Sequence, residues 1–465
     1  MYDFCIIGGG VIGCAVAREL TRYKTSVAVV EAREDVCTGA SGANSGIIHA
    51  GYDPLPKTLK AIYNATGAKM FPAYAAALGV PFVRTGSLLV AFGDDGKDKL
   101  RILLDRGEKN GIKNLRVIRK EDALAIEPRV SPDLTAALYA SDAGITDPFA
   151  FTFALKENAE KNGAHFEFGF EVVSCETAQG GISLLSSTGA RITAKRVVNC
   201  AGEGAGPVAR ALGDLVYMKH RLGEYILFDA PSAVGMPVFG VPDEKGKGVV
   251  VAPAVSGKFF IGPTSVEVGR VRPYFRREAV RELFAAAEKL VPGLGDSPRL
   301  TRYSGIRTAS GDGDFRIFKG SRENVWHMIG IDSPGITAAP AIATSFARSF
   351  GLERDPAFDP VRRPTVKLSG KSAAEKRALI ARDPRYGNIV CRCECVSEAE
   401  VTDAVRRGAR TLDGVKKRLG TGMGKCQGSG CDDKIIAILS RELGKPVTEI
   451  DKNVRGSELY LGEGT

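Results

Sequence analysis

The sequence lacks any long hydrophobic run and any secretory leader. No apolar stretch among its 465 residues approaches the roughly twenty that span a bilayer. This absence excludes a membrane-spanning helix, although it leaves peripheral contact with a membrane open. The amino terminus has no basic segment followed by an apolar one and starts directly with a strand-like stretch. We therefore expect a cytoplasmic protein.

The sequence also lacks any cluster in which basic and aromatic residues alternate, despite a formal net charge of +10. Its basic residues occur as scattered pairs, and this pattern argues against binding to nucleic acid. A positive surface instead favours encounters with a small anionic substrate or an acidic partner. The length predicts about three domains, and 44% hydrophobic with 25% charged residues is typical of a globular protein.

Cysteine is scarce over most of the chain and concentrated near its end. Five of the ten cysteines fall within residues 391–431, as Cys391-x-Cys393-x-Cys395 and then Cys426-x4-Cys431. Soft thiolates gathered in this way favour zinc, copper or an iron–sulfur cluster. The scattered remainder are expected to be small buried hydrophobic residues rather than disulfide partners: Cys5, Cys14, Cys37, Cys175 and Cys200.

The first thirty residues predict a nucleotide-binding unit. Residues 4–7 form a short apolar run, residues 8–13 read Gly-Gly-Gly-Val-Ile-Gly, and residues 14–23 predict a helix. A second strand over residues 26–30 ends at Glu31, where an acidic side chain can accept hydrogen bonds from a ribose. Strand, glycines, helix, strand and acidic residue in this order are a specific signal, unlike the glycines alone.

Each glycine of the turn has a separate role in this interpretation. Gly8 permits the tight turn, Gly10 lets a diphosphate approach the backbone, and Gly13 lets the helix pack against the strand. The helix then offers free amides and the positive end of its dipole to the pyrophosphate. The small, polar segment over residues 38–46 can run along the diphosphate, and residues 47–51 place His49 among small neighbours.

Three segments carry a resemblance to a known family. Residues 41–51, together with the opening glycines, resemble the D-amino-acid-oxidase-type FAD oxidoreductases. Residues 197–202 are similar to the strand and turn that return to the FAD domain, and residues 329–340 to the final strand, loop and helix. The resemblance covers about residues 1–350. Within the superfamily it is greatest to glycerol-3-phosphate dehydrogenases and oxidases and to L-2-hydroxyglutarate oxidases.

The resemblance implies FAD as the cofactor. Gly335 starts an apolar helix over residues 336–350, whose amides and positive dipole end would favour negative charge on a reduced flavin. The residues expected to contact FAD are Gly8, Gly10, Val11, Ile12, Gly13, Glu31, Ala32, Thr38, Ser41, Gly42, Asn44, Ser45, Gly46, Ile47, Ala201, Gly202, Arg307, Pro334, Gly335, Ile336 and Thr337.

Two stretches between the FAD segments have a different sequence pattern, in which alternating strands are mixed with amphipathic helices. They predict a sheet-based substrate domain inserted twice into the nucleotide-binding domain, with the pocket between this sheet and the flavin. The expected strands cover residues 87–92, 225–229, 248–252 and 258–262, and one expected helix covers residues 277–290.

Arg307 is the predicted anion-binding residue, since a guanidinium fork holds a carboxylate or phosphate through two parallel hydrogen bonds. It lies in residues 305–308, which are expected to follow a strand, and the family resemblance supports the same position. Lys258 and Arg302 are further candidate anion contacts.

His49 is the predicted acid–base residue, and His220 is a second candidate. Transfer of a hydride from an alcohol to the flavin requires removal of the hydroxyl proton, which a histidine can accept. We therefore expect a dehydrogenase acting on a small anionic 2-hydroxy compound, glycerol 3-phosphate first and L-2-hydroxyglutarate second. An amino-acid or opine dehydrogenase subunit, or an electron-transfer subunit of a multi-flavin complex, remains an alternative.

The carboxyl-terminal region predicts a small helical module. Residues 351–388 are rich in Pro, Lys and Arg, with a charged helix over residues 372–381, and are expected to be a tether. Ser397 and Glu400 fit a capping box behind the first cysteines. Further helices are expected from residue 411 and over residues 434–443.

The paired thiolates predict a tetrahedral sulfur site or a [2Fe–2S] cluster. The spacing resembles the bacterioferritin-associated-ferredoxin-like [2Fe–2S] domain, which implies Cys391, Cys393, Cys426 and Cys431 as ligands. Alternation along a strand would place Cys395 on the same face as its neighbours, but we expect it to be a free thiol. Zinc, or a redox disulfide, is the alternative.

The predicted fold is therefore an α/β FAD-binding Rossmann-like domain with an inserted α+β substrate domain, plus a small helical C-terminal cysteine-cluster domain. The oxidoreductase would cover residues 1–365, residues 366–387 would be the linker, and residues 388–465 would bind the cluster. Its FAD parts would be about 1–80, 146–212 and 303–352, and its substrate parts about 81–145 and 213–302. Resemblance to multi-subunit members of the family implies a second, NAD-linked flavoprotein or another electron acceptor as partner, within an oligomer or complex.

Overall fold

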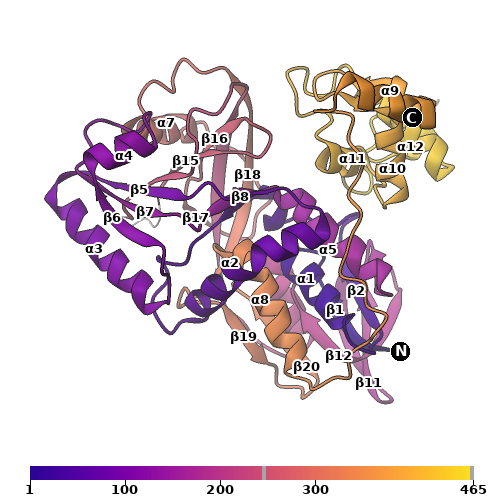
Figure 1. Cartoon of the computed structure of the whole chain (residues 1–465). Coiled ribbons are helices and arrows are strands. Elements are labelled where there is room, and N and C mark those ends of the chain that lie inside the picture. The colour runs from indigo at the N-terminus through magenta and orange to yellow at the C-terminus, as the bar shows by residue number, and fades with distance from the viewer. Residues whose placement is uncertain (243–247, 461–465) are drawn as a thin grey trace.

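The structure is a computed structural model that describes residues 1–242 and 248–460. Residues 461–465 of the predicted cluster domain lie outside this range. Two sheet-based bodies form the main mass of the molecule, and a helical body lies beside them at the end of the chain (Figure 1). This arrangement confirms the predicted fold class.

The nucleotide-binding body is built on an eight-stranded sheet whose central strands β12, β1, β2 and β9 run parallel. Residues Phe4 to Ile7 of β1 are buried, as expected for a central parallel strand covered on both faces. The strands are β1 (Tyr2–Ile7), β2 (Val27–Glu31), β9 (His165–Phe168), β10 (Val172–Ala178), β11 (Gly181–Ser186), β12 (Arg191–Asn199), β19 (Arg316–Lys319) and β20 (Val325–Ile329).

Helix α1 begins at Val11, three residues earlier than expected, because the last glycine of the turn, Gly13, already belongs to its first turn. It packs between α5 and α8, and α2 packs on α8. The helices of this body are α1 (Val11–Leu20), α2 (Leu59–Leu78), α5 (Pro148–Lys161), α6 (Ala205–Ala211) and α8 (Gly335–Arg348). A small sheet beside them contains β3 (Ile47–Ile48), β4 (Phe82–Val83) and β8 (Gly144–Thr146).

The substrate body is a nine-stranded, mainly antiparallel sheet assembled from segments far apart in the chain. The four strands expected here are present; three shift by one or two residues at their ends, and β13 begins at Met218, well before the expected residue 225. The strands are β5 (Ser87–Ala91), β6 (Leu115–Arg119), β7 (Ala136–Ala140), β13 (Met218–Phe228), β14 (Val238–Gly240), β15 (Val250–Pro253), β16 (Phe259–Gly262), β17 (Val266–Val268) and β18 (Arg299–Ser310). Its helices are α3 (Gly93–Lys109), α4 (Lys120–Ile126) and α7 (Ala279–Leu290).

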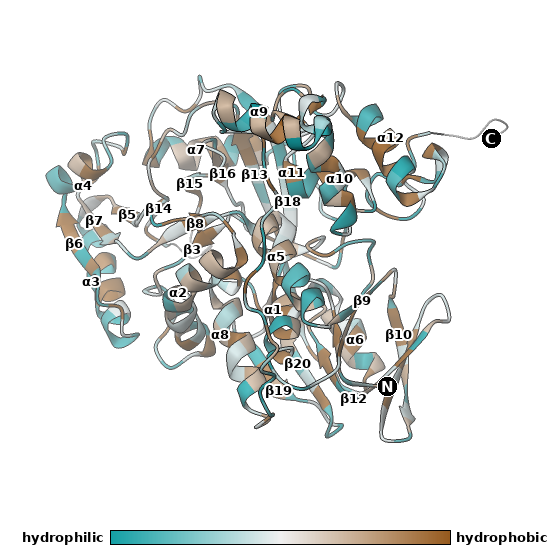
Figure 2. Ribbon diagram, turned by 45° about the vertical axis from the view of Figure 1, so that its right-hand side comes forward, coloured by the Kyte–Doolittle hydropathy of each residue, from teal (hydrophilic) through white to brown (hydrophobic). Residues whose placement is uncertain are grey.

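Hydrophobic residues line the strands of both sheets, whereas α3 at the edge of the substrate body is largely hydrophilic (Figure 2). Leu100 and Leu103 are its buried leucines, so α3 covers the sheet with one apolar stripe. Of the helices in the described part of the chain, none combines the length and apolarity that a bilayer crossing requires.

The carboxyl-terminal body is helical, as predicted. Its elements are α9 (Ala373–Arg382), β21 (Ile389–Cys391), β22 (Val396–Ser397), α10 (Glu398–Arg406), α11 (Leu412–Leu419) and α12 (Asp432–Leu443). Both hydrogen bonds of the predicted Ser397–Glu400 capping box are present. The core of this body is separate and contains Val401, Val415 and Ile435.

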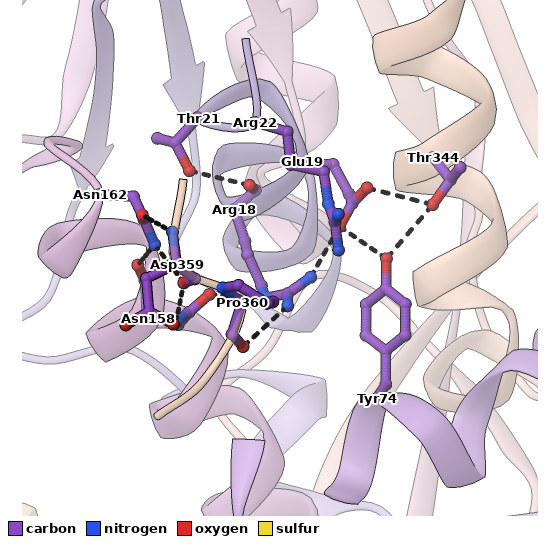
Figure 3. A network of polar contacts seen from close by, with 10 residues as sticks. All are labelled: Arg18, Glu19, Thr21, Arg22, Tyr74, Asn158, Asn162, Thr344, Asp359 and Pro360. Carbon is purple, nitrogen blue, oxygen red and sulfur yellow. Dashed lines mark hydrogen bonds and ion pairs between the residues drawn. The ribbon is translucent and has the colours of Figure 1, made fainter. Parts of the chain in front are cut away.

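The segment that connects the bodies is held against the nucleotide-binding body. The backbone oxygen of Asp359 accepts hydrogen bonds from Asn158 and Asn162, and that of Pro360 accepts one from Arg18 (Figure 3). The Arg18 side chain is buried and forms an ion pair of 2.7 Å with Glu19. The first part of the predicted tether is therefore a fixed strap, since buried polar groups of α1 and α5 bind its backbone.

Candidate functional site

A cavity of about 810 Å³ lies between the two sheet-based bodies. One wall comes from the nucleotide-binding body and the other from the substrate sheet. The nucleotide side includes Val11, Ser41, Asn44, Ser45, Ile47, His49, Pro334, Gly335 and Ile336, and the sheet side includes Arg221, Tyr225, Phe239, Thr264, Gly305 and Arg307. A pocket against the substrate sheet was expected, and the cavity lies there; the place of the flavin in it stays a prediction.

The sheet wall is formed by β13 and β18, which pair in antiparallel register. Alternate residues of a strand share one face, so three successive cross-strand pairs project to the same side. These pairs are Arg221 with Arg307, Gly223 with Gly305, and Tyr225 with Tyr303. The wall therefore presents a cationic row, a bare row and an aromatic row.

The glycine row brings the sheet close to the nucleotide-binding body. A Cβ atom at Gly305 would lie 2.4 Å from the Cβ of Ala43, in the polar segment after β2. A Cβ at Gly223 would lie 3.2 Å from Pro263 and 3.4 Å from Nε of Arg307. Glycine at these two positions therefore allows the close approach of the two bodies and leaves room for the Arg307 side chain.

The aromatic row, Tyr225 and Tyr303, lies next to the glycine row on the side away from the two arginines. The rings of Tyr225 and Tyr303 stack with their centroids 4.8 Å apart and their planes at 7°. Burial raises the pKa of the Tyr225 hydroxyl, an effect that the nearby charge of Arg307 opposes. Both phenols therefore stay neutral and act as apolar walls with polar tips.

Arg307 lies in the interior of β18, not after a strand as expected, because the strand continues to Ser310. Its Nη2 donates a hydrogen bond of 2.9 Å to the backbone oxygen of Thr264. Its Nε is buried and has no hydrogen-bond partner among the described residues. A buried donor without a partner is costly, and because Arg307 also lines the cavity, a ligand bound there can supply the missing acceptor.

His49 follows β3 and is held from α8 and from the loop before it. Its backbone N–H donates to Oγ1 of Thr337 at 3.1 Å, and its Nε2 lies 3.3 Å from Oγ of Ser333. Its ring lies 6.0 Å from that of Phe239 on the opposite wall. The imidazole is therefore positioned by backbone and hydroxyl contacts at the edge of the cavity.

The glycine turn after β1 has the close contacts that such a turn requires. Gly8 has a φ of +111°, and a Cβ there would lie 2.6 Å from the backbone oxygen of Cys200. A Cβ at Gly13 would lie 2.0 Å from the backbone oxygen of Gly8. Oγ of Ser41 accepts a hydrogen bond of 2.9 Å from the backbone of Val11, which ties the polar segment to the start of α1.

Glu31 ends β2 as predicted and also binds the glycine turn. Its two carboxylate oxygens accept hydrogen bonds from the backbone of Gly9 at 2.6 Å and of Arg33 at 2.9 Å. Burial raises the pKa of this carboxyl, and the two backbone bonds oppose the shift. Each oxygen has a second lone pair, so the contacts are compatible with an additional ribose hydroxyl.

The remaining predicted FAD residues lie in the turns next to the cavity. Gly10, Ile12 and Gly13 belong to the turn and to α1. Gly42 lies within the short helix Ala40–Ala43, and Ala32, Thr38 and Gly46 lie in the loops before and after it. Ala201 and Gly202 follow β12. These segments follow the neighbouring parallel strands β1, β2 and β12, and their contacts with FAD remain a prediction.

Neither α1 nor α8 has a side-chain cap at its amino terminus, where Gly10 and Pro334 are the N-cap residues. Uncapped first-turn amides and the positive dipole end favour an anion. Val11 and Gly335, at these two ends, both line the cavity. The site therefore fits a group with one anionic centre near α1 and another near α8, as FAD has in its diphosphate and its reduced ring.

Two candidate anion contacts lie outside the cavity. Nζ of Lys258 forms an ion pair of 2.9 Å with Glu394 of the carboxyl-terminal body. The guanidinium of Arg302 lies over the Phe275 ring. These two predictions were wrong for this cavity, because neither side chain lines it.

His220 lies on β13 next to Arg221 and therefore projects to the opposite face of the sheet. Sequence reasoning missed Arg221 and Lys60, which both line the cavity. Lys60 forms an ion pair of 2.6 Å with Asp332. The signal that could have found Arg221 is its cross-strand pairing with Arg307, which depends on the register of β13 and β18.

The predicted cluster ligands come together as two pairs. Sγ of Cys393 lies 3.7 Å from Sγ of Cys426, and two sulfurs bound to one tetrahedral metal at about 2.3 Å are about 3.8 Å apart. Cys391 is close enough to Cys431 to raise the pKa of that thiol, which burial and this neighbour bring to about 12. Backbone N–H groups of Gly430 and Gly428 lower the pKa of Cys426.

This arrangement is compatible with a two-iron cluster. Four cysteines serve both irons of a [2Fe–2S] cluster. Two thiolates for each iron correspond to the two observed pairs.

Cys395 departs from the expected strand geometry. Strand β21 ends at Cys391 and residues 392–395 form a turn, in which Cys395 has a φ of +53°. Its side chain packs beside Leu368 and Tyr386, in a small apolar cluster apart from the other cysteines. The argument from strand alternation was therefore wrong, and the expectation that Cys395 is a free thiol rather than a ligand stays a prediction.

Comparison with known proteins accords with this geometry. Residues 3–348 match the FAD dependent oxidoreductase family, and residues 389–441 match the BFD-like [2Fe-2S] binding domain. A glycerol 3-phosphate dehydrogenase of Caloramator mitchellensis is 38% identical, with 99% of this chain and 98% of that protein covered. An L-2-hydroxyglutarate dehydrogenase of Arabidopsis thaliana is 26% identical, with 75% and 83% covered.

Among solved structures, the FAD-bound L-alpha-glycerophosphate oxidase of Mycoplasma pneumoniae superposes with a TM-score of 0.74. It is 30% identical, and the match covers 78% of this chain and 99% of that one. These findings confirm FAD and a [2Fe–2S] cluster as the cofactors. The chain belongs to the family of FAD-dependent oxidoreductases and carries a BFD-like [2Fe–2S] domain in its carboxyl-terminal part.

Proposed function

We propose that this FAD-dependent oxidoreductase oxidises glycerol 3-phosphate to dihydroxyacetone phosphate. The observation that carries the proposal is the placement of His49 and Arg307 on facing sides of one cavity. A small substrate held by its anionic group at Arg307 can thereby present its hydroxyl to the imidazole. The similarity to a glycerol 3-phosphate dehydrogenase along nearly the whole chain supports this substrate.

Bound FAD supplies the hydride acceptor. Arg307 fixes the anionic end of the substrate through the nitrogen that the fold leaves without a partner. His49 removes the hydroxyl proton, and the contact between its Nε2 and Oγ of Ser333 positions the ring before the substrate binds. Phe239 and the tyrosine row exclude water from the apolar side of the cavity.

We also propose that the [2Fe–2S] cluster is the route by which electrons leave, one at a time, toward an NAD-linked flavoprotein or another acceptor. The carboxyl-terminal body is held to the substrate body by the Lys258–Glu394 ion pair, and Glu394 lies next to the ligand Cys393. Metal analysis that finds zinc without iron would contradict this route.

L-2-hydroxyglutarate is the second candidate substrate, since it also carries a hydroxyl beside an anionic group and its dehydrogenases are relatives of this chain. Amino acids are the third candidate. A chain that serves only as an electron-transfer subunit would react with none of them.

The test is anaerobic mixing of the purified holoenzyme with each candidate while the flavin absorbance is followed. We expect glycerol 3-phosphate to bleach the flavin fastest. The His49→Asn variant should keep its flavin spectrum and lose about 10²- to 10⁴-fold in the rate of bleaching. Faster bleaching by L-2-hydroxyglutarate or an amino acid would reassign the substrate. No bleaching by any candidate, with bleaching by NADH and a partner flavoprotein, would reassign the chain as a transfer subunit.

A further inference from the structure

The cationic row of the cavity wall contains two arginines directly opposite each other. Arg221 of β13 pairs with Arg307 of β18 in the antiparallel register, and both side chains line the cavity. Like charges at directly opposed positions destabilise a sheet. The repulsion between Arg221 and Arg307 therefore lowers the stability of the fold, and a bound anion would relieve it.

Other cations of the same cavity are neutralised by the protein. Lys60 pairs with Asp332, and Arg276 pairs with the buried Glu224 at 2.8 Å. Within the described residues, neither Arg221 nor Arg307 has a carboxylate partner. Glu267 lies opposite Arg221 on β17, but its side chain is exposed and forms no ion pair with it.

The two positive charges of Arg221 and Arg307 indicate how much negative charge their ligand carries. A single carboxylate would leave one of the two guanidinium groups uncompensated in a half-buried position. A phosphate monoester carries close to two negative charges at neutral pH and three acceptor oxygens, enough for forks from both arginines. The two carboxylates of L-2-hydroxyglutarate are separated along the molecule, so only one of them can occupy the row.

We propose that Arg221 is a specificity-determining residue that completes, with Arg307, a subsite for the phosphate dianion of a phosphorylated 2-hydroxy substrate. The proposal rests on the proposed function and names the group that the cavity selects. The bare glycine row beside the arginines then leaves space for the carbon chain that joins this phosphate to the reacting hydroxyl.

The test compares a phosphorylated and an unphosphorylated substrate. In the holoenzyme, Arg221→Met should lower the second-order rate of anaerobic flavin reduction by glycerol 3-phosphate on the order of 10²-fold. The slow reduction by glycerol should not change. Arg221→Lys keeps the charge without the fork and should lie between the two. Arg302→Met, on the same strand but outside the cavity, is the matched control and should behave as the wild type.

A second measurement separates this proposal from the choice of substrate. The affinity of the oxidised holoenzyme for inorganic phosphate, by calorimetry, should fall in Arg221→Met and not in Arg302→Met. If glycerol 3-phosphate fails to reduce the wild-type flavin, the proposed function is wrong, while a loss of phosphate affinity in Arg221→Met still supports the subsite. Unchanged phosphate affinity, or an equal loss of rate with glycerol and glycerol 3-phosphate, would overturn it.

Discussion

Two arginine environments in this molecule differ in the group that compensates the positive charge. Arg418 of α11, in the carboxyl-terminal body, is buried, with only 6% of its side chain exposed. Its Nη2 lies 3.0 Å from Asp35, and its guanidinium lies 3.8 Å above the Phe153 ring of α5. Arg221 and Arg307 face the cavity with no carboxylate among the described residues. The first environment joins two parts of the fold, and the second is completed by a ligand.

The difference distinguishes structural cations from functional ones. A charge that the protein itself pairs and stacks contributes to the folded state, and its removal leaves the partner exposed to the cost of burial. A charge that the fold leaves without a partner contributes little to stability, because only a ligand compensates it. Fold stability and catalytic activity should therefore respond in opposite ways to substitution in the two environments.

The largest effect on stability is expected for Arg418→Met. Asp35 is 4% exposed, so loss of its partner should cost about 3–5 kcal/mol at the contact between the two bodies. We expect faster proteolytic cleavage within residues 366–387 and a lower midpoint of thermal unfolding. Arg382→Met, on the exposed face of α9, is the control and should change neither quantity. Equal cleavage rates for the two variants would show that the contact does not hold the bodies together.

Arg307→Met should show the opposite behaviour. Its midpoint of thermal unfolding should stay within a few degrees of the wild type, since the variant leaves no buried carboxylate unpaired and relieves the repulsion from Arg221. The rate of flavin reduction by glycerol 3-phosphate should fall on the order of 10²- to 10³-fold. A variant that unfolds early while keeping its activity would contradict the functional assignment of this residue.

The smallest effect is expected for Cys395→Ser, and the quantity measured is the content of the iron–sulfur cluster. This prediction extends the comparison from arginines to cysteines. Cys395 packs in its own apolar cluster, whereas Cys393 faces Cys426 at 3.7 Å. Iron and acid-labile sulfide per protein should be unchanged in Cys395→Ser and should be lost in Cys393→Ser. Retention of the cluster in Cys393→Ser together with its loss in Cys395→Ser would show that Cys395 is the ligand and Cys393 the free thiol.

Local interactions account for what could be predicted from the sequence. The strand–turn–helix around Gly8 and Gly13 and the capping box of Ser397 and Glu400 involve residues close together in the chain. Their hydrogen bonds and steric limits are nearly independent of the rest of the fold. Such signals located the nucleotide-binding unit, both cysteine pairs and the order of the three bodies, while the division at residues 365 and 387 stays a prediction.

Strand register and contacts between separate parts of the fold account for the features that the sequence did not predict. Cys395 was assigned to a strand face, but a turn with positive φ redirects it. Lys258 carries a charge suited to a substrate, but its partner Glu394 lies in another body. In each case the deciding contact joins residues that are distant in the chain or depends on a backbone conformation that composition does not reveal.

The sequence by itself determined the two cofactors, the nucleotide-binding topology and the identity of His49 and Arg307 as candidates, because short motifs carry that information. Tertiary structure alone decided that Arg221 faces Arg307 and that Arg418 meets Asp35, 383 residues away. The physical reason is that a side chain acquires its role from the charges around it. Those charges are gathered by pairing of distant strands and by packing between separate cores.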